Sequence, residues 1–209
     1  MRTFTIVTGG RTGSTFLVRT LNRHSSIYCI GEFFHPGNKN LPSHRFEKPT
    51  ESLYGYYQQQ GKQICGCKII SGRDNKFVGE VIEKSEVNII LKRRNKLQQV
   101  VSSYVASMVN DWEDYSKKVH EPFIVPIDFI KRFYGGYLER DKDMEGLPNQ
   151  FELYYEDFSL DKFNEMFQRL GVSFVSSIDF EEGPQRKKVY SLIVNKKELE
   201  DMFGYSLED

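Results

Sequence analysis

A glycine-rich turn between a strand pattern and a helix pattern places the strongest constraint on how this chain folds. Residues Thr3–Thr8 form a short β-rich run, and Gly9 follows them at once. From Ser14 to Arg23, apolar residues recur at a helical period. A glycine turn placed directly between a strand and a helix leaves backbone N–H groups at the helix start, where they attract anions. The opening segment therefore predicts an α/β unit with an anion-binding turn.

The alternation of strand and helix patterns continues to the end of the chain. Strands are expected at Thr3–Thr8, Ile27–Ile30, Gln63–Ile70, Val87–Leu91 and Phe151–Tyr155. Helices are expected at Ser14–Arg23, Glu51–Gln60, Phe77–Lys84, Leu97–Val109, Pro126–Arg140, Leu160–Leu170 and Val194–Phe203, with a polar, irregular stretch at Asn110–Pro126. Such alternation predicts a central, mainly parallel sheet covered by helices on both faces, which is a three-layer α/β sandwich. We expect a single domain over residues 1–209.

Charge and hydropathy narrow the possible partners. Lys and Arg number 29 and Asp and Glu number 29, so the formal net charge is zero. A non-specific nucleic-acid binder usually carries a basic excess, so we expect no nucleic-acid partner. No apolar run approaches the roughly 18 residues of a membrane-spanning helix, so we expect no membrane partner. The first residues do not resemble a signal peptide either, and we expect a cytoplasmic protein.

The three cysteines, Cys29, Cys65 and Cys67, form no spaced framework, which is typical of a reduced compartment. Cys65 and Cys67 lie inside a strand-like apolar run. We expect them to be buried as small hydrophobic residues rather than to bind a metal. The four histidines also lack metal-ligand spacing, so no metal site is expected.

The glycine turn carries donors for an anion. Thr12, Ser14 and Thr15 supply hydroxyl groups, and Arg11 adds a fixed positive charge. The alternative is an ordinary turn in which Ser14 caps the helix. The turn departs from the Walker A pattern because Ser14, not a lysine, follows Gly13. Phosphate-type binding is compatible with this departure, whereas ATP–magnesium chemistry is disfavoured.

Two segments together resemble a known enzyme family. The run Arg11–Leu17 resembles the 5′-phosphosulfate loop of sulfotransferases that use 3′-phosphoadenosine 5′-phosphosulfate (PAPS). The run Leu91–Tyr104 resembles their 3′-phosphate motif, in which an arginine at a strand end and a serine eight or nine residues later hold the nucleotide. The pattern is most similar to the bacterial carbohydrate-type branch. The resemblance implies a single sulfotransferase domain with a P-loop-kinase-like sheet, PAPS as donor and PAP (adenosine 3′,5′-bisphosphate) as product.

The resemblance also implies which residues bind the nucleotide. They are Arg11, Thr12, Gly13, Ser14, Thr15, Arg93 or Arg94, Ser102, and the C-terminal Arg186 and Lys187. Arg93 is preferred for the 3′-phosphate and Arg94 is its rival, nine and eight residues before Ser102. Arg93 and Ser102 are expected to face the ligand rather than the core. In the family-like segment Tyr154–Phe158, Glu156 and Asp157 are expected to cap the next helix or to brace the loops.

The acceptor side is implied by the same resemblance. Many cytosolic members place a histidine two residues after a lysine, but here Ile70 follows Lys68 at that spacing. The bacterial carbohydrate branch instead has a glutamate after its second strand, in a segment that Gly31–Phe34 resembles. The resemblance therefore implies Glu32 as the general base, with His35 as the alternative. A plain salt bridge is the structural interpretation of Glu32. Lys68 and Arg11 are expected to stabilise charge on the leaving phosphate.

The acceptor itself is expected to be a hydroxyl of a carbohydrate or small metabolite. Candidate pocket walls are Phe33, Phe34, Tyr54–Tyr57 and Tyr115, which are equally suited to the core. Two other functions remain open. One is a nucleoside or small-molecule kinase with an altered phosphate loop, and the other is a non-catalytic nucleotide-binding module.

Overall fold

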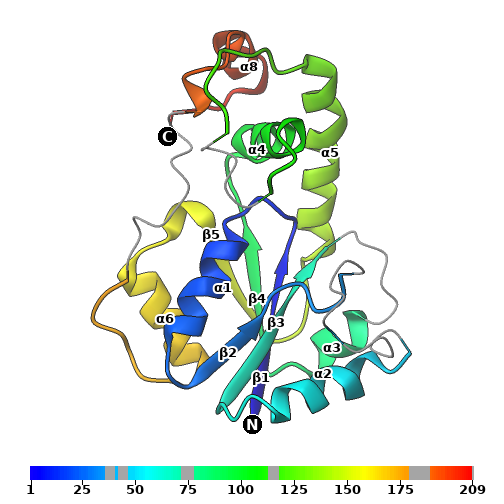
Figure 1. The fold of residues 1–209 in the computed structure, drawn as a ribbon, viewed down its shortest axis with the longest axis vertical. Helices are drawn as coiled ribbons and strands as arrows, with labels where there is room; N and C mark the ends of the chain where they lie inside the picture. Colours follow the sequence, from blue (N-terminus) through cyan, green and yellow to red (C-terminus); the bar gives the residue numbers. More distant parts are fainter. Residues whose placement is uncertain (36–40, 42–46, 72–77, 113–117, 179–188, 209) are drawn as a thin grey trace.

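Five parallel strands form the centre of the molecule in a computed structural model that describes residues 1–35, 41, 47–71, 78–112, 118–178 and 189–208 (Figure 1). The strands are β1 (Arg2–Thr8), β2 (Ile27–Ile30), β3 (Ile64–Ile70), β4 (Val87–Lys92) and β5 (Gln150–Tyr154). Their order across the sheet is β2-β3-β1-β4-β5, and every neighbouring pair is parallel. The predicted parallel sheet is confirmed.

Helices cover both faces of this sheet. The helices are α1 (Ser14–Arg23), α2 (Pro49–Gln58), α3 (Val78–Lys84), α4 (Lys96–Met108), α5 (Ile127–Asp143), α6 (Leu160–Leu170) and α8 (Lys196–Phe203). In Figure 1, α1 and α6 lie on one side of the sheet, and α2 and α3 lie on the other. Helices α4 and α8 and the first part of α5 extend beyond the carboxyl ends of the strands. The expected three-layer sandwich is present, with an additional helical cluster above it.

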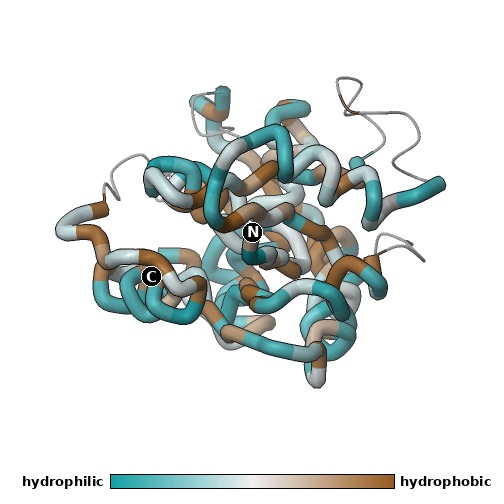
Figure 2. The backbone as a smooth tube through the Cα atoms, turned by 90° about the horizontal axis from the view of Figure 1, so that it is seen from below, coloured by the Kyte–Doolittle hydropathy of each residue, from teal (hydrophilic) through white to brown (hydrophobic). Residues whose placement is uncertain are grey.

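Alternate residues of the central strand β1 reach opposite faces of the sheet. Phe4 and Ile6 belong to the apolar cluster that contains Leu17 of α1 and Phe163 of α6. Val7 belongs to the cluster on the α2 and α3 side. Because both faces of the strand are covered, nearly all of β1 is buried. Figure 2 shows hydrophobic segments running through the interior, with hydrophilic segments outside them.

The third apolar cluster joins α4, α5 and α8 rather than the sheet. Leu97, Val101 and Val105 of α4 pack there with Ile130 of α5 and Leu199 of α8. Helix α4 is buried along almost its whole length, including its polar residues. Its glutamines and serines are therefore held inside the protein, close to the end of β4 from which the helix starts.

Several element boundaries differ from the sequence prediction by one to three residues, and two of them have a clear structural cause. Strand β5 ends at Tyr154 because Tyr155–Asp157 turn into a 3₁₀ helix. Helix α8 begins at Lys196 rather than Val194, because Ile193 pairs with Phe123 in a parallel bridge. The bridge between Phe123 and Ile193 adds extended backbone that the apolar periodicity did not indicate.

The cysteines are buried in the sheet, as predicted. Cys29, Cys65 and Cys67 are free thiols with little or no exposed surface. Burial raises the pKa of the Cys67 thiol to about 12, so it stays protonated at neutral pH. These residues act as small core side chains on β2 and β3.

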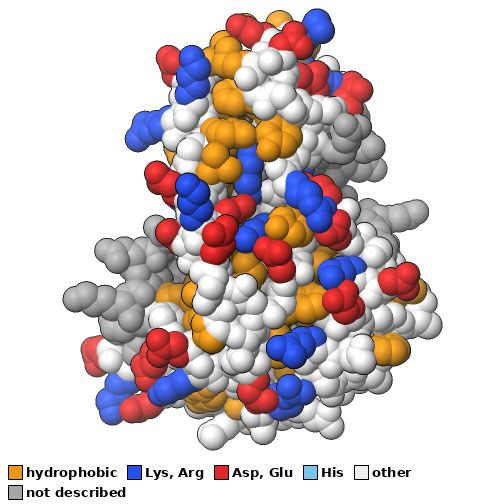
Figure 3. Space-filling model, turned by 180° about the vertical axis from the view of Figure 1, so that it is seen from behind, with side chains coloured by type: hydrophobic (Ala, Val, Ile, Leu, Met, Phe, Trp, Pro, Cys, Tyr) orange, Lys and Arg blue, Asp and Glu red, His pale blue; other side chains and the backbone are white. Residues whose placement is uncertain are grey.

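The surface carries charges of both signs, in line with the equal numbers of acidic and basic residues in the sequence. Figure 3 shows acidic and basic side chains interspersed over one face, with hydrophobic side chains between them. In the described ranges, no helix is both long and apolar enough to cross a bilayer.

Gly66 of β3 offers a test of the packing between β3 and β1. A Cβ atom at this position would lie 2.4 Å from the ring of Phe4, which is fully buried. We expect Gly66→Ala to lower the free energy of unfolding by about 1–3 kcal/mol, because the buried ring must shift. Urea denaturation measures the change.

Gly55→Ala is the matched control for this substitution. A Cβ atom at Gly55 in helix α2 meets no heavy atom within 4 Å among the described residues. Alanine there should leave the stability unchanged or raise it by about 0.5–1 kcal/mol, since glycine weakens a helix. Equal effects of the two substitutions would contradict the packing argument.

Candidate active site

The predicted site residues of the described chain gather at the carboxyl edge of the sheet. The glycine loop follows β1, Glu32 follows β2, Lys68 lies near the end of β3, and Arg93 follows β4. All strands of a parallel sheet end at the same edge, and ligands of such sheets bind there. Segments separated by up to 90 residues therefore meet in one region.

The glycine loop has a strained, left-handed backbone. Gly10, Arg11 and Gly13 have φ angles of 83°, 57° and 81°. Gly13 is the N-cap of α1, and no described side chain caps this helix. The alternative in which Ser14 caps the helix is therefore wrong, since Ser14 is already the first helical residue. The uncapped first turn leaves backbone N–H groups and the positive end of the helix dipole for an anion.

The hydroxyl groups of the loop do not all face the same way. Thr12 is completely buried, and its hydroxyl shares a hydrogen bond with the hydroxyl of Thr8 at the end of β1. Ser14 is buried, whereas Thr15 is exposed. The Thr12 hydroxyl, which was expected to donate to an anion, is thus already engaged in a hydrogen bond that fixes the loop to β1.

Arg11 connects the loop to the second predicted motif. Its Nε donates to the Ser102 hydroxyl over 3.0 Å, and its Nη1 donates to the carbonyl of Trp112. Ser102 lies in α4 and is fully buried. The two motifs that carried the family resemblance therefore meet side chain to side chain.

The two rival arginines have different surroundings. Arg93 is only 2% exposed, and its guanidinium stacks on the Tyr155 ring with 4.6 Å between the guanidinium carbon and the ring centroid. It donates to the Arg11 carbonyl over 3.4 Å and to the side-chain carbonyl of Gln98. Its Nε is buried and has no hydrogen-bond partner in the described structure; the Glu156 carboxylate lies 3.9 Å away.

Arg94 instead turns toward the surface. Its two terminal nitrogens form a bidentate pair with the Asp157 carboxylate, both at 2.6 Å. Its guanidinium also lies over the Tyr154 ring, with 4.1 Å to the centroid. This pair lowers the pKa of Asp157 and raises that of Arg94. Arg93, not Arg94, points to the glycine loop.

Glu156 and Asp157 brace the loops rather than cap the next helix. The Glu156 carboxylate accepts hydrogen bonds from the backbone N–H groups of Arg94 and Asn95, both over 3.0 Å. Helix α6 is capped by Ser159, whose side chain accepts from the Lys162 N–H. Of the two expected roles, bracing is therefore the one that the structure supports.

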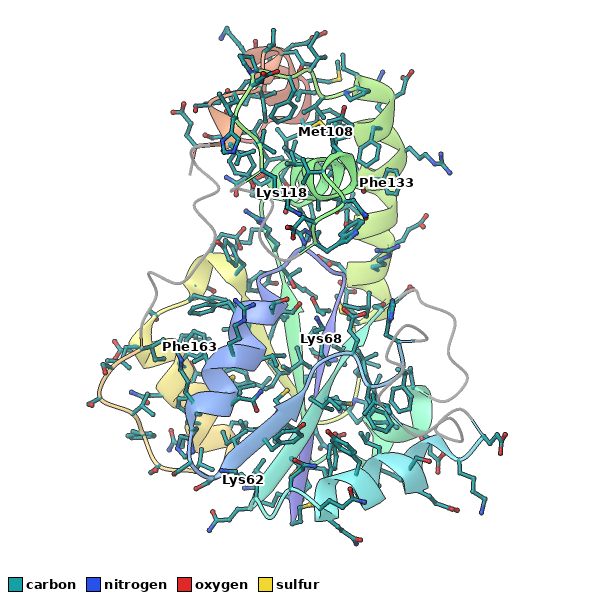
Figure 4. All side chains as sticks on the ribbon, in the orientation of Figure 1. Lys62, Lys68, Met108, Lys118, Phe133 and Phe163 are labelled. Atoms are coloured by element: carbon teal, nitrogen blue, oxygen red, sulfur yellow. The ribbon has the colours of Figure 1, made fainter. Side chains whose placement is uncertain are left out.

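The acceptor-side candidates also meet. Lys68 Nζ lies 3.1 Å from a Glu32 carboxylate oxygen. Glu32, His35 and Lys68 line one small pocket, and Phe34 and Val78 form part of its wall. Figure 4 shows Lys68 near the middle of the molecule, at the upper end of the sheet. The ion pair orients the carboxylate, but it does not distinguish between Glu32 and His35 as a base.

Some expectations about individual residues are wrong. Arg93 and Ser102 are buried and contact protein groups, so their removal affects the fold as well as any ligand. For Phe33 and Tyr57, the core is the alternative that the structure supports. Arg186, Lys187 and Tyr115 lie outside the described residues.

Four residues that the motifs did not indicate also belong to the site. They are Gln99 of α4, Trp112, Arg140 of α5 and Tyr155. Only Gln99 left a signal, because a glutamine among Leu97, Val100 and Val101 is an unusual residue in a helix that is buried all round.

Comparisons with known proteins were made by sequence and by fold. No family model matches the chain. Nodulation protein H of Rhizobium tropici is 28% identical over 129 residues, which cover 57% of this chain and 52% of that protein. The solved structure of mouse sulfotransferase SULT7A1 complexed with PAP has a TM-score of 0.54 and 13% identity, covering 84% of this chain and 61% of the mouse chain. The chain spans about half the length of the curated relative.

The fold that the resemblance implied is confirmed. The fold of the mouse enzyme is shared over most of the described chain. The glycine loop and the Arg93–Ser102 segment lie at the carboxyl edge of the sheet, where ligands of parallel α/β sheets bind. The family resemblance that was inferred from two short motifs thus extends to the arrangement of the sheet.

Gly13 of the glycine loop is constrained by its neighbours. A Cβ atom there would lie 2.5 Å from Tyr155 Cδ2 and 3.2 Å from Phe158 Cε2, and the φ of 81° disfavours any side chain. A valine at Gly13 would therefore disturb the fold directly instead of merely occupying the place of an anion. Substitution of this glycine does not isolate ligand binding.

The burial of the two arginines predicts different effects on stability. Arg93→Ala should lower the free energy of unfolding by about 1–3 kcal/mol, because the buried Gln98 carbonyl loses its donor. Arg94→Ala should cost less than about 1 kcal/mol, since its pair with Asp157 is solvent-exposed. Chemical denaturation of both variants measures the order, and a larger loss for Arg94→Ala would contradict the assignment of Arg93 as the buried partner of the loop.

Proposed function

We propose that this protein is a PAPS-dependent sulfotransferase that acts on a hydroxyl of a carbohydrate or another small metabolite. The observation that carries the proposal is the hydrogen bond from Arg11 to Ser102, 91 positions apart in the chain. It joins the segment that resembles a 5′-phosphosulfate loop to the segment that resembles a 3′-phosphate motif. The mouse sulfotransferase structure is a complex with PAP, which supports the same ligand here.

The described residues suit the two charged ends of the nucleotide. The uncapped start of α1, with Gly13, Ser14 and Thr15, would bind the 5′-phosphosulfate through backbone and hydroxyl donors. Ser102 and Arg93 would bind the 3′-phosphate. The buried Arg93 Nε, without a hydrogen-bond partner in the described structure, is a donor that a phosphate oxygen would satisfy. Arg186 and Lys187 remain proposed ligands on the basis of the resemblance alone.

The charges at the other end suit transfer to a hydroxyl. When bound, PAPS supplies the sulfuryl group, whose sulfur gains a bond to the acceptor oxygen as its bond to the phosphate oxygen breaks. Glu32 is proposed to accept the proton that leaves the acceptor hydroxyl. Lys68, 3.1 Å from Glu32, orients that carboxylate and adds a positive charge beside the base. Arg11 adds a second positive charge on the side of the phosphosulfate.

Calorimetry with two nucleotides tests the donor class. The wild-type protein should bind PAP in the absence of a metal, and it should bind ATP–magnesium more weakly. The physical reason is that Ser14 replaces the Walker lysine, while the Arg93 and Ser102 region is suited to a 3′-phosphate. Preference for ATP–magnesium would favour the kinase alternative. Binding of PAP without transfer to any acceptor would favour the non-catalytic module.

Ser102→Ala tests the 3′-phosphate contact without removing the buried guanidinium of Arg93. The variant should bind PAP about 10- to 150-fold more weakly than the wild type, because a hydrogen bond to a charged group is lost. Its affinity for adenosine 5′-monophosphate, which has no 3′-phosphate, should change little. Titration with both nucleotides gives the ratio of affinities directly.

Ser103→Ala is the control for this measurement. Ser103 is also buried in α4, but its hydroxyl pairs with the Tyr137 hydroxyl at 2.5 Å instead of with Arg11. We expect its ratio of PAP to adenosine 5′-monophosphate affinity to equal that of the wild type. If both variants show the same decrease in the ratio of PAP affinity to adenosine 5′-monophosphate affinity, the effect comes from loosening of α4, not from a phosphate contact.

Glu32→Gln tests the proposed base. The amide cannot accept the acceptor proton, so kcat should fall by about 100- to 10,000-fold while the affinity for PAP is kept. His35→Asn serves as the comparison, because His35 lines the same pocket. If His35→Asn loses the activity and Glu32→Gln retains it, the base is His35 and Glu32 is a structural partner of Lys68.

A further inference from the structure

Three successive carbonyl groups of the glycine loop each accept a hydrogen bond from a side chain elsewhere in the chain. The Gly9 carbonyl accepts from Arg140 Nη1 over 3.2 Å. The Gly10 carbonyl accepts from Gln99 Nε2 over 2.6 Å. The Arg11 carbonyl accepts from Arg93 Nη1 over 3.4 Å. The donors come from α5, from α4 and from the turn after β4, and they approach the loop from its protein side.

These three bonds determine where the loop N–H groups point. In a trans peptide unit, the carbonyl and the following N–H point in opposite directions. The described peptide bonds are all trans. Holding the carbonyls of Gly9, Gly10 and Arg11 toward the protein therefore turns the N–H groups of Gly10, Arg11 and Thr12 away from it. A run of N–H groups on one side of a turn is an anion-binding concavity.

Gln99 is itself held in one orientation. It is fully buried, and its side-chain carbonyl accepts from Lys96 Nζ over 3.2 Å. Lys96 Nζ in turn pairs with the Asp141 carboxylate over 2.6 Å and donates to the Arg93 carbonyl. Because Lys96 has no acceptor, it fixes the amide of Gln99 with its nitrogen toward Gly10.

Arg140 is fixed from the neighbouring helix. Its guanidinium lies over the Tyr137 ring, with 5.3 Å to the centroid, and the Tyr137 hydroxyl pairs with Ser103 of α4. Arg140 also directly precedes Asp141, the partner of Lys96. One turn of α5 and the first two turns of α4 thus contribute a connected set of polar groups, and two members of that set donate to the loop.

We infer that Gln99 and Arg140 are positioning residues that hold the glycine loop in its anion-binding conformation. They act on the backbone of Gly9 and Gly10 from the side opposite the ligand. Two adjacent glycines can rotate their peptide units at little cost, so the loop conformation depends on outside contacts. This inference rests on the proposed function, because the anion is taken to be the 5′-phosphosulfate of the nucleotide.

The test separates the 5′-phosphate from the rest of the nucleotide. The probes are PAP and adenosine 3′-monophosphate, which differ only in the 5′-phosphate. Gln99→Met keeps the size of the side chain but removes the donor to Gly10. We expect its affinity for PAP to fall about 3- to 10-fold, while its affinity for adenosine 3′-monophosphate is unchanged. Calorimetric titration of each protein with each nucleotide gives both values.

Arg140 adds a rescue experiment. Arg140→Met should reduce the affinity for PAP at least as much as Gln99→Met does, and Arg140→Lys should recover part of it, because a lysine ammonium still donates to the Gly9 carbonyl. Gln99→Glu is the second variant at the first position. It retains the pair with Lys96 but places an acceptor against the Gly10 carbonyl, so a folded Gln99→Glu protein should also lose affinity for PAP selectively.

Gln150→Met is the matched control. Gln150 also donates its side-chain amide to a backbone carbonyl, that of Met144, but at the amino end of β5, away from the loop. It should leave both affinities unchanged. Equal loss of both affinities in the Gln99 variants, or no loss at all, would overturn the positioning role. If the wild type binds PAP no more tightly than adenosine 3′-monophosphate, the anion-binding loop itself is refuted and the proposed function fails with it.

Discussion

The parallel sheet is the constraint on which the site depends. All five strands run in one direction, so all five carboxyl ends meet at one edge. The loops that follow them carry the glycine turn, Glu32, Arg93 and the Tyr155–Asp157 segment. Residues that are far apart in the chain therefore lie close together, because the strands that precede them end at the same edge of the sheet. Lys68, near the end of β3, lies at this edge for the same reason.

This edge contains several buried cations, and the fold neutralises each of them. Lys68 pairs with Glu32, Lys92 with Glu152, and Lys96 with Asp141. The buried Arg93 has Glu156 at 3.9 Å and the face of Tyr155. A buried ion without a partner is strongly destabilising, so an ion pair is expected wherever a charged residue at the end of a strand is buried. The pairing keeps the cations in place without a bound nucleotide.

The same pairing has consequences for the proposed chemistry. A site for a highly charged nucleotide needs positive charge that is already oriented when the ligand arrives. Here the orientation comes from side chains on the protein side. The Glu156 carboxylate accepts from two backbone N–H groups of the turn after β4, and the Gln99 amide nitrogen donates to the Gly10 carbonyl of the glycine loop. Helix α4 is central to this arrangement, because it supplies Lys96, Gln99 and Ser102 from successive turns of one buried helix.

The amino-acid sequence by itself determined the alternation of strands and helices, the position of the glycine turn between β1 and α1, and the presence of two family-like motifs. Local patterns were sufficient for these features because apolar periodicity and glycine positions act within a few residues, and α1 begins at Ser14 and ends at Arg23 as predicted. The tertiary structure alone decided that Arg93 turns inward while Arg94 pairs with Asp157, and that Glu156 braces a loop instead of capping a helix. It also brought the Gln99 and Arg140 side chains to the carbonyls of Gly10 and Gly9. Adjacent arginines have the same intrinsic preferences, so the choice between them depends on burial and on partners more than 60 residues away, which no local pattern contains.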